Sequence, residues 1–271
     1  MKISGNRIYI YLIIIVVLFG CAQEPLQPKL IRSMVEFDQA YIPALIFTNL
    51  QKQRESELAV ERLRKKWDKF NQKYYGLEIK YGKDITDKFW KEDFDQISAL
   101  IVSAEGFVKQ KKLSAARGKL EGIRVVLLEL RSRNGLKYFL DGMTGFHNSM
   151  EGLILTLTGK DKLNDKDVFK LRLLFKEAQS SWTKVAGSEI DLLLFGFDPK
   201  KIEAVKKRIQ EEEQGMASLA AALSSKDADR IFQAAQDLKP NFMVLYKAFG
   251  DFQPIFDKVV KERKEKETRL K

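Results

Sequence analysis

One segment of the chain carries side chains that are suited to binding a metal ion. Met143, His147 and Met150 are spaced i, i+4 and i+7, so a helix places all three on one face, with Glu151 one turn beyond the histidine. Two thioethers and an imidazole suit copper, especially Cu(I), and a histidine with a methionine also binds haem iron. These four residues are therefore the candidate ligands of a copper or haem site.

The same segment has a simpler, structural interpretation. His147 is the only histidine in the chain, whereas a specific metal site normally needs ligands that converge from several elements. Beside it lies a stripe of small residues, which allow two helices to approach closely while methionine fills gaps in a core. The stripe consists of Gly142, Gly145, Ser149 and Gly152. We therefore expect no cofactor and keep copper or haem as the alternative.

Patterns of catalytic residues are missing elsewhere in the sequence. There is one cysteine and one histidine, and there is no glycine-rich phosphate loop, zinc-ligand spacing or nucleophile elbow. Trp67 and Trp182 are of a type that stacks on ligands, but each lies in a heptad stripe that predicts a core position. We expect a protein that is not an enzyme and has no catalytic residue.

The start of the chain has the pattern of an export signal. Lys2 and Arg7 precede an uncharged apolar run from Ile8 to Phe19, which is shorter than the roughly 20 residues of a membrane-spanning helix. A basic start, a short apolar run and a small residue near its end are typical of a secretory signal peptide, with an uncleaved N-terminal anchor as the alternative. The run closes with Leu18-Phe19-Gly20-Cys21, which resembles the lipobox of bacterial lipoproteins.

This resemblance implies a lipid anchor. In bacterial lipoproteins a peptidase cuts before the cysteine, here Cys21, whose thiol carries a diacylglyceryl group and whose amine is acylated. Phe19 is bulkier than the residue usual at its position. Each buried CH₂ group contributes about 0.8 kcal/mol, so several acyl chains hold a domain firmly to a bilayer. Ala22 rather than Asp follows the cysteine, which under enteric-type sorting implies the periplasmic face of the outer membrane rather than the inner membrane.

The charge of the chain limits its partners. The net charge is +11, and a basic protein attracts anionic lipid head groups, nucleic acid or acidic ligands. We expect no nucleic-acid partner, because the chain is predicted to be exported and carries no recognisable binding motif. The segment from Lys258 to Lys271 holds seven basic and three acidic residues, which predicts a solvated helix. Contact of this tail with an anionic surface or a protein partner is the alternative.

Apolar residues recur at steps of three and four along most of the chain, which predicts an all-α fold. One such stripe runs from Leu113 to Leu130 and another from Val60 to Tyr74. Pro43 and Pro240 fall inside predicted helices, where we expect kinks. The expected helices span about 29–53, 55–75, 87–110, 113–133, 136–158, 167–187, 199–224 and 227–249, followed by a tail helix.

The second half of the chain repeats the first. An offset of 115 residues places Trp182 on Trp67 and carries the stripe of 113–130 onto 228–245. The leading helix aligns at an offset of 109, FDQAYIPAL with FHNSMEGLI, so the extra residues fall in the loop 159–167. Unrelated heptads that share a phase by accident are the alternative to duplication.

We therefore predict two tandem antiparallel four-helix units that pack together. The predicted boundaries are a signal peptide 1–20, a tether 21–29, a first unit 30–135, a second unit 136–250 and a basic helical tail 251–271.

Antiparallel four-helix units in an exported protein resemble the bundles of the cytochrome b562 and cytochrome c′ type. Covalent haem attachment in the cytochrome c′ family needs a CXXCH motif near the end of the last helix, which this chain lacks. The b562 pattern needs a methionine on the first helix, for which Met34 qualifies, and a histidine on the last helix, where none occurs. The resemblance implies the fold without its haem.

The function expected from the sequence is that of a lipid-anchored, non-enzymatic helical-bundle protein of the bacterial cell envelope. Such a protein acts as a scaffold or a binding module and contacts the membrane through the lipid on Cys21. The first alternative is a copper- or haem-binding protein for metal handling or electron transfer. A helical sensor module is the second alternative.

Overall fold

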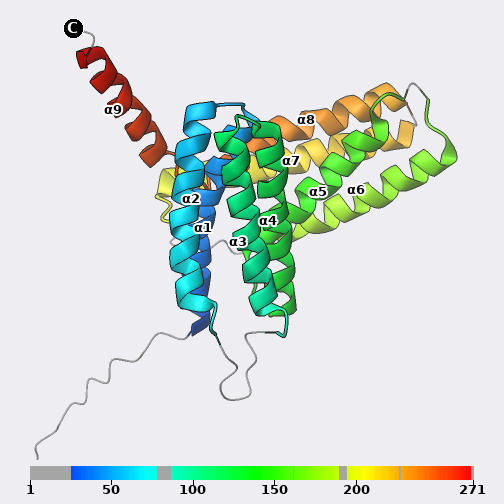
Figure 1. The fold of residues 1–271 in the computed structure, drawn as a ribbon. Coiled ribbons are helices and arrows are strands. Elements are labelled where there is room, and N and C mark those ends of the chain that lie inside the picture. The colour runs from blue at the N-terminus through cyan, green and yellow to red at the C-terminus, as the bar shows by residue number, and fades with distance from the viewer. Residues whose placement is uncertain (1–25, 78–86, 161, 189–193, 226, 270–271) are drawn as a thin grey trace, which may run out of the picture.

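Helices make up the regular structure in the described part of the chain. The computed structural model describes residues 26–77, 87–160, 162–188, 194–225 and 227–269 (Figure 1). Within these ranges there are nine helices and no strand, as the apolar periodicity predicts. They are α1 (Leu26–Asn49), α2 (Gln53–Tyr74), α3 (Trp90–Lys109), α4 (Leu113–Arg133), α5 (Phe139–Leu157), α6 (Asp165–Ala186), α7 (Pro199–Ser225), α8 (Ala228–Lys247) and α9 (Gln253–Arg269).

The first eight helices form two four-helix units, which confirms the predicted fold class. Sequential helices pair as α1 with α2, α3 with α4, α5 with α6 and α7 with α8, and further contacts close α1–α4 and α5–α8 into separate bundles. In Figure 1 the α1–α4 unit stands upright, and the α5–α8 unit branches from its side and runs across it. The two units meet where α1 contacts α8 and where α4 contacts α5.

The two units bury equivalent positions. Phe37 and Trp67 contact each other with ring centroids 5.5 Å apart, and Phe146 and Trp182 repeat this contact at 4.8 Å. At the offset of 115 residues, buried positions on α2, α3 and α4 recur on α6, α7 and α8. At the offset of 109, buried positions on α1 recur on α5. This shared packing supports an internal duplication.

α1 begins and ends earlier than predicted. It starts at Leu26, so residues 26–29 are helical and do not belong to the tether predicted over 21–29, whose first five residues lie outside the described ranges. Pro28 is compatible with this start, because the N–H groups of a first helical turn have no intrahelical acceptor. At the other end, Gln51 has a φ of 54° in the turn that follows Asn49.

A proline inside α1 helps to join the two units. Pro43 has no N–H to donate to the carbonyl of Gln39, one helical turn earlier. That carbonyl instead accepts a hydrogen bond of 2.9 Å from the backbone N–H of Asp251, in the loop between α8 and α9. Arg62 on α2 then donates to the backbone carbonyl of Asp251 at 2.7 Å and to its carboxylate at 2.5 Å. The end of the second unit is thereby bound to the first.

Gly250 permits this close approach, which makes it a test position. A Cβ atom at Gly250 would lie 2.8 Å from Ile42 Cγ2 and 2.8 Å from Phe252 Cε2. We expect Gly250→Ala to lower the free energy of unfolding by about 1–3 kcal/mol through overpacking. In the control Gly118→Ala, the Cβ atom meets open space, and a helical glycine replaced by alanine gains about 0.5–1 kcal/mol. Urea unfolding measures both, and equal midpoints for the two variants would show that the loop is not tightly docked.

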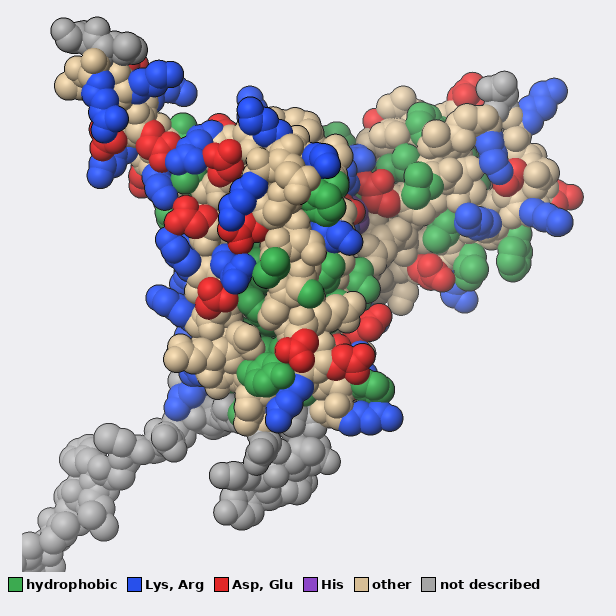
Figure 2. Space-filling model, viewed as in Figure 1, with side chains coloured by type: hydrophobic (Ala, Val, Ile, Leu, Met, Phe, Trp, Pro, Cys, Tyr) green, Lys and Arg blue, Asp and Glu red, His purple; other side chains and the backbone are tan. Residues whose placement is uncertain are grey.

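α9 and the residue before it contact the first unit. Phe252, which precedes α9, and Phe256 within it contact Phe47 at 5.6 and 5.8 Å between centroids, and Arg54 on α2 forms an ion pair of 2.5 Å with Glu262. Beyond this contact the helix projects away from the body and carries many Lys and Arg side chains (Figure 2). Over the ranges given above, no helix combines the length and the apolar character needed to cross a membrane.

Candidate functional site

The predicted metal ligands lie on α5 at the junction of the two units. Met143 and Met150 are fully buried, and His147 is 8 % exposed. The carboxylate of Glu151 is 2.9 Å from Lys239 Nζ on α8 and 3.8 Å from His147 Nε2. The structure therefore brings His147 and Glu151 together. The two methionines of the same helix are buried in the hydrophobic core.

The imidazole of His147 already has a partner. Arg124 Nη2 on α4 lies 2.7 Å from His147 Nδ1. A guanidinium group only donates, so Nδ1 accepts and the neutral ring carries its proton on Nε2. Burial, followed by the charge of Arg124, lowers the pKa of His147 to about 3, so the ring is neutral at physiological pH. A metal at Nδ1 would have to displace Arg124, and a metal at Nε2 would have to displace its proton.

The small residues of α5 have the structural role that the sequence suggests. A Cβ atom at Gly142 would lie 2.8 Å from Val185 Cγ2, and one at Gly145 would lie 2.7 Å from Ser181 Oγ, both on α6. Gly142 and Gly145 therefore let α5 and α6 approach more closely than larger residues would allow. This close approach supports the structural interpretation for Gly142 and Gly145. It accounts for these two glycines without any ligand.

A second buried polar cluster lies at the same junction. Arg131 on α4 donates to the carboxylate of Asp141 on α5 from Nε at 2.9 Å and from Nη2 at 2.5 Å. Its guanidinium also lies 4.4 Å from the centre of the Tyr138 ring. Burial raises the pKa of Asp38 on α1 to about 6, against the charge of Arg131. Sequence periodicity did not identify this cluster, because its members are placed together only by the packing of one unit on the other.

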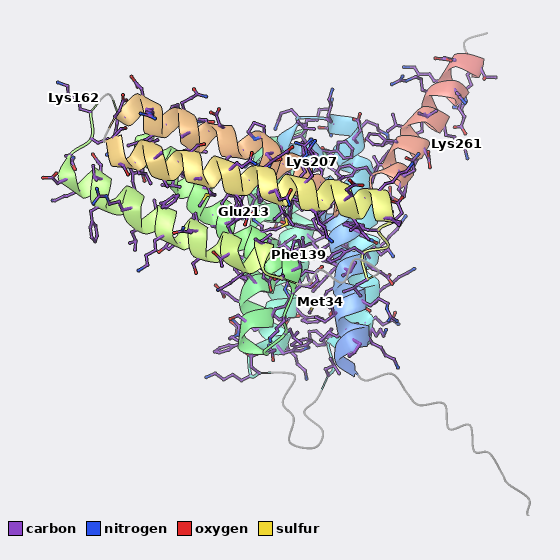
Figure 3. The ribbon with its side chains drawn as sticks, turned by 180° about the vertical axis from the view of Figure 1, so that it is seen from behind. Met34, Phe139, Lys162, Lys207, Glu213 and Lys261 are labelled. Carbon is purple, nitrogen blue, oxygen red and sulfur yellow. The ribbon has the colours of Figure 1, made fainter. Side chains whose placement is uncertain are left out.

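A cleft lies between α6 and α7 in the second unit. Its volume is about 510 Å³, which is within the range of about 300–1,000 Å³ for small-molecule pockets. Figure 3 shows Glu213 on α7, on the stretch of that helix that passes α6. The side chains that line it include Phe175, Gln179, Trp182, Glu213, Met216 and Ala220.

The equivalent groove of the first unit is bridged. Arg64 on α2 forms an ion pair of 3.1 Å with Glu105 on α3. Nearby, the indole N–H of Trp67 donates to Ser98 Oγ on α3 at 2.8 Å. Two interactions thus connect α2 and α3 across the groove.

Both bridges are lost in the second unit. The offset of 115 residues replaces Arg64 by Gln179 and Glu105 by Ala220, so no ion pair can form. It also replaces the hydroxyl of Ser98 by Glu213, whose side chain is exposed. The indole N–H of Trp182 is consequently buried without a hydrogen-bond partner. Trp182 is buried, as its heptad stripe predicts, and the change from Ser98 to Glu213 between the two halves is the sequence signal for its missing partner.

An ionisable group is buried on α7 next to the cleft residue Glu213. Glu212 is 1 % exposed and occupies the position of Ile97 in the first unit. Its Oε2 accepts a hydrogen bond of 2.5 Å from Asn241 Nδ2 on α8, and its Oε1 has no partner. Burial raises the pKa of Glu212 to about 7. The second unit thus buries an ionisable group at a position where the first unit has the apolar side chain of Ile97.

Comparisons with known proteins identify no relative. No family model, no curated protein and no solved structure matches the chain.

Proposed function

We propose that this protein is a lipid-anchored, non-enzymatic binding module of the bacterial cell envelope, with the cleft between α6 and α7 as its ligand site. The observation that carries the proposal is the difference between the two units. The two units bury equivalent positions, but the groove that Arg64 and Glu105 bridge in the first unit is open in the second. An unbridged groove that leaves the N–H of Trp182 without a partner is costly to keep unless a ligand compensates.

The anchor would hold the first unit close to the membrane. Cys21, the predicted lipidation site, lies outside the described residues, and α1 begins at Leu26. An extended residue spans at most about 3.6 Å. A lipid on Cys21 would therefore keep the start of α1 within about 18 Å of the bilayer surface. The second unit branches from the part of the first unit farther from this end (Figure 1).

Replacing the predicted lipidation site tests the anchor. We expect Cys21→Ser to move the protein from the membrane fraction to the soluble fraction and to remove the acyl groups from its intact mass. Mass spectrometry of the two fractions measures this. A Cys21→Ser chain that is still lipid-modified and processed as before would contradict the anchor and leave the cleft unaffected.

The cleft is tested through its tryptophan. The chain has three tryptophans, so labelling the full-length protein with fluorotryptophan yields one ¹⁹F resonance each for Trp67, Trp90 and Trp182. The Trp182→Phe variant assigns the last of these. We expect small molecules that bind in the cleft to move the Trp182 resonance and to leave Trp67 and Trp90 in place. A screen in which Trp67 responds as often as Trp182 would contradict a site in the second unit.

Copper or haem binding remains the second candidate function, because Met143, His147 and Met150 share one helix and are buried. Titration of the full-length chain with Cu(I), Cu(II) and haem, followed by absorbance, tests it. We expect no tight complex, because Arg124 engages His147 Nδ1. A tight complex that is lost in His147→Ala would establish this candidate instead.

A further inference from the structure

The cleft carries one charge, and it is negative. Of the described residues that line it, only Glu213 is ionisable, and no ion pair is found for Glu213 within the described ranges. The neighbouring Glu211, one residue before Glu212, is instead paired with Arg208 at 2.7 Å. A carboxylate at the edge of a cleft, without a cation of its own, favours a positively charged ligand.

The remaining lining favours an organic cation over a metal ion. Phe175 and Trp182 contribute aromatic rings, and Met216 contributes a thioether. Aromatic rings attract ammonium groups through their electron-rich faces, and they also accommodate an apolar body. One carboxylate among such groups does not provide the several oxygen ligands that a hard divalent cation requires.

The unpartnered indole adds a second requirement. The Nε1–H of Trp182 is buried and has no acceptor, whereas that of Trp67 donates to Ser98 Oγ. A buried donor without an acceptor is unfavourable, so a ligand that supplies an acceptor gains affinity. Glu213 is the counterpart of Ser98, but its exposed side chain makes no such bond.

We propose that the cleft between α6 and α7 binds an organic ammonium ion with an apolar body and one hydrogen-bond acceptor. Glu213 faces the ammonium group, Phe175 and Met216 contact the apolar body, and the indole N–H of Trp182 donates to the acceptor. The inference rests on the proposed function, because it assigns a ligand class to the same cleft.

A matched set of probes tests each part of this ligand. Phenacyltrimethylammonium carries the cation, the ring and a carbonyl acceptor. Neopentyl phenyl ketone has the same shape without the charge, benzoylpropionate reverses the charge, and phenethyltrimethylammonium lacks the acceptor. Each probe is titrated into the full-length, fluorotryptophan-labelled chain, and dissociation constants are measured in parallel by calorimetry.

We expect phenacyltrimethylammonium to move the Trp182 resonance alone and to bind about tenfold more tightly than the uncharged ketone, because the ketone loses the ion pair with Glu213 and the general attraction of the aromatic lining for a cation. Benzoylpropionate is expected not to bind. Glu213→Gln is expected to weaken the cation about threefold to fivefold, as for an exposed ion pair. The matched control Glu211→Gln removes the same charge outside the cleft and is expected to have no effect.

The acceptor is tested by a double comparison. Phenacyltrimethylammonium is expected to bind about fivefold more tightly than phenethyltrimethylammonium in the natural chain, as for one hydrogen bond. This preference is expected to vanish in Trp182→Phe.

The contrary outcomes are distinct. If the ketone binds in the cleft as tightly as the cation, or if Glu213→Gln and Glu211→Gln behave alike, the ligand class is wrong and the cleft remains a binding site. If no member of the set moves the Trp182 resonance, the ligand class is overturned, and the screen described for the proposed function then decides whether the cleft binds any other compound.

Discussion

Replacing Arg131 by methionine is expected to lower the free energy of unfolding by about 3–5 kcal/mol, because a buried carboxylate loses its partner. Arg131 is 2 % exposed and donates to Asp141 through Nε and Nη2. It also lies over the ring of Tyr138, and its charge opposes the rise that burial causes in the pKa of Asp38. Without Arg131, two carboxyl groups at the junction of the units have no counter-ion in this cluster.

This loss is expected to depend on pH. Burial raises the pKa of Asp38 and of Asp141 against the charge of Arg131, and removing the cation raises both further. The carboxyls of the variant then take up protons, so the deficit shrinks as the pH falls from about 7 to about 4. Urea unfolding followed by circular dichroism at the two pH values measures the change.

An exposed ion pair is the control for Arg131. Arg117 is 2.8 Å from Glu121 and about a third exposed, so Arg117→Met is expected to cost less than about 1 kcal/mol. Equal losses for the two variants would contradict the view that Arg131 holds the units together through a buried contact.

Glu212→Gln is expected to stabilise the protein by about 2–3 kcal/mol at about pH 8. Burial raises the pKa of Glu212 from its ordinary value of 4.5 to about 7. Between these two values the unfolded chain loses the proton while the folded chain keeps it, so stability falls as the pH rises. Above about 7 the folded state also ionises and the full cost is reached. Glutamine keeps the hydrogen bond with Asn241 and never ionises.

The pH dependence distinguishes this effect from better packing. At about pH 4 the carboxyl is protonated in both states, so Glu212→Gln and the natural chain are expected to unfold at nearly the same urea concentration. Glu213→Gln on the neighbouring exposed residue is expected to change stability little at either pH. A gain for Glu212→Gln that is the same at both pH values would contradict the burial of an ionisable carboxyl.

Apolar periodicity predicted the helices well because each must bury a stripe of side chains. The predicted 113–133 coincides with the observed Leu113–Arg133, and the predicted 199–224 differs from Pro199–Ser225 by one residue. Trp67 and Trp182 are buried at equivalent places, as the offset of 115 residues predicts. α1 starts three residues before the predicted residue 29, because a first helical turn accepts a proline such as Pro28.

Periodicity shows which face of a helix is buried, but not what that face contacts. The pairing of Arg124 with His147 joins residues on different helices and in different units, so spacing within one helix carried no information about it. The bond from Asp251 to Gln39 likewise depends on an acceptor freed by Pro43, far away in the chain. These contacts set the chemistry of the junction. The metal site predicted from spacing within one helix therefore did not include Arg124, which engages His147 Nδ1.

The cleft was missed for a different reason. Its existence depends on residues that are absent from the second unit, namely counterparts of Arg64 and Glu105. Gln179 and Ala220 carry no catalytic or metal-binding group that would single them out in the sequence. They stand out only when each half is aligned with the other, because Arg64 and Glu105 occupy the equivalent positions of the first half.

Rebuilding the missing bridge tests the cleft as a ligand site. The double variant Gln179→Arg with Ala220→Glu copies the ion pair of Arg64 and Glu105 into the second unit. We expect the variant to fold normally, and we expect that a compound which moves the Trp182 resonance of the natural chain no longer does so. Unchanged binding of that compound by the bridged variant would contradict the cleft as the ligand site.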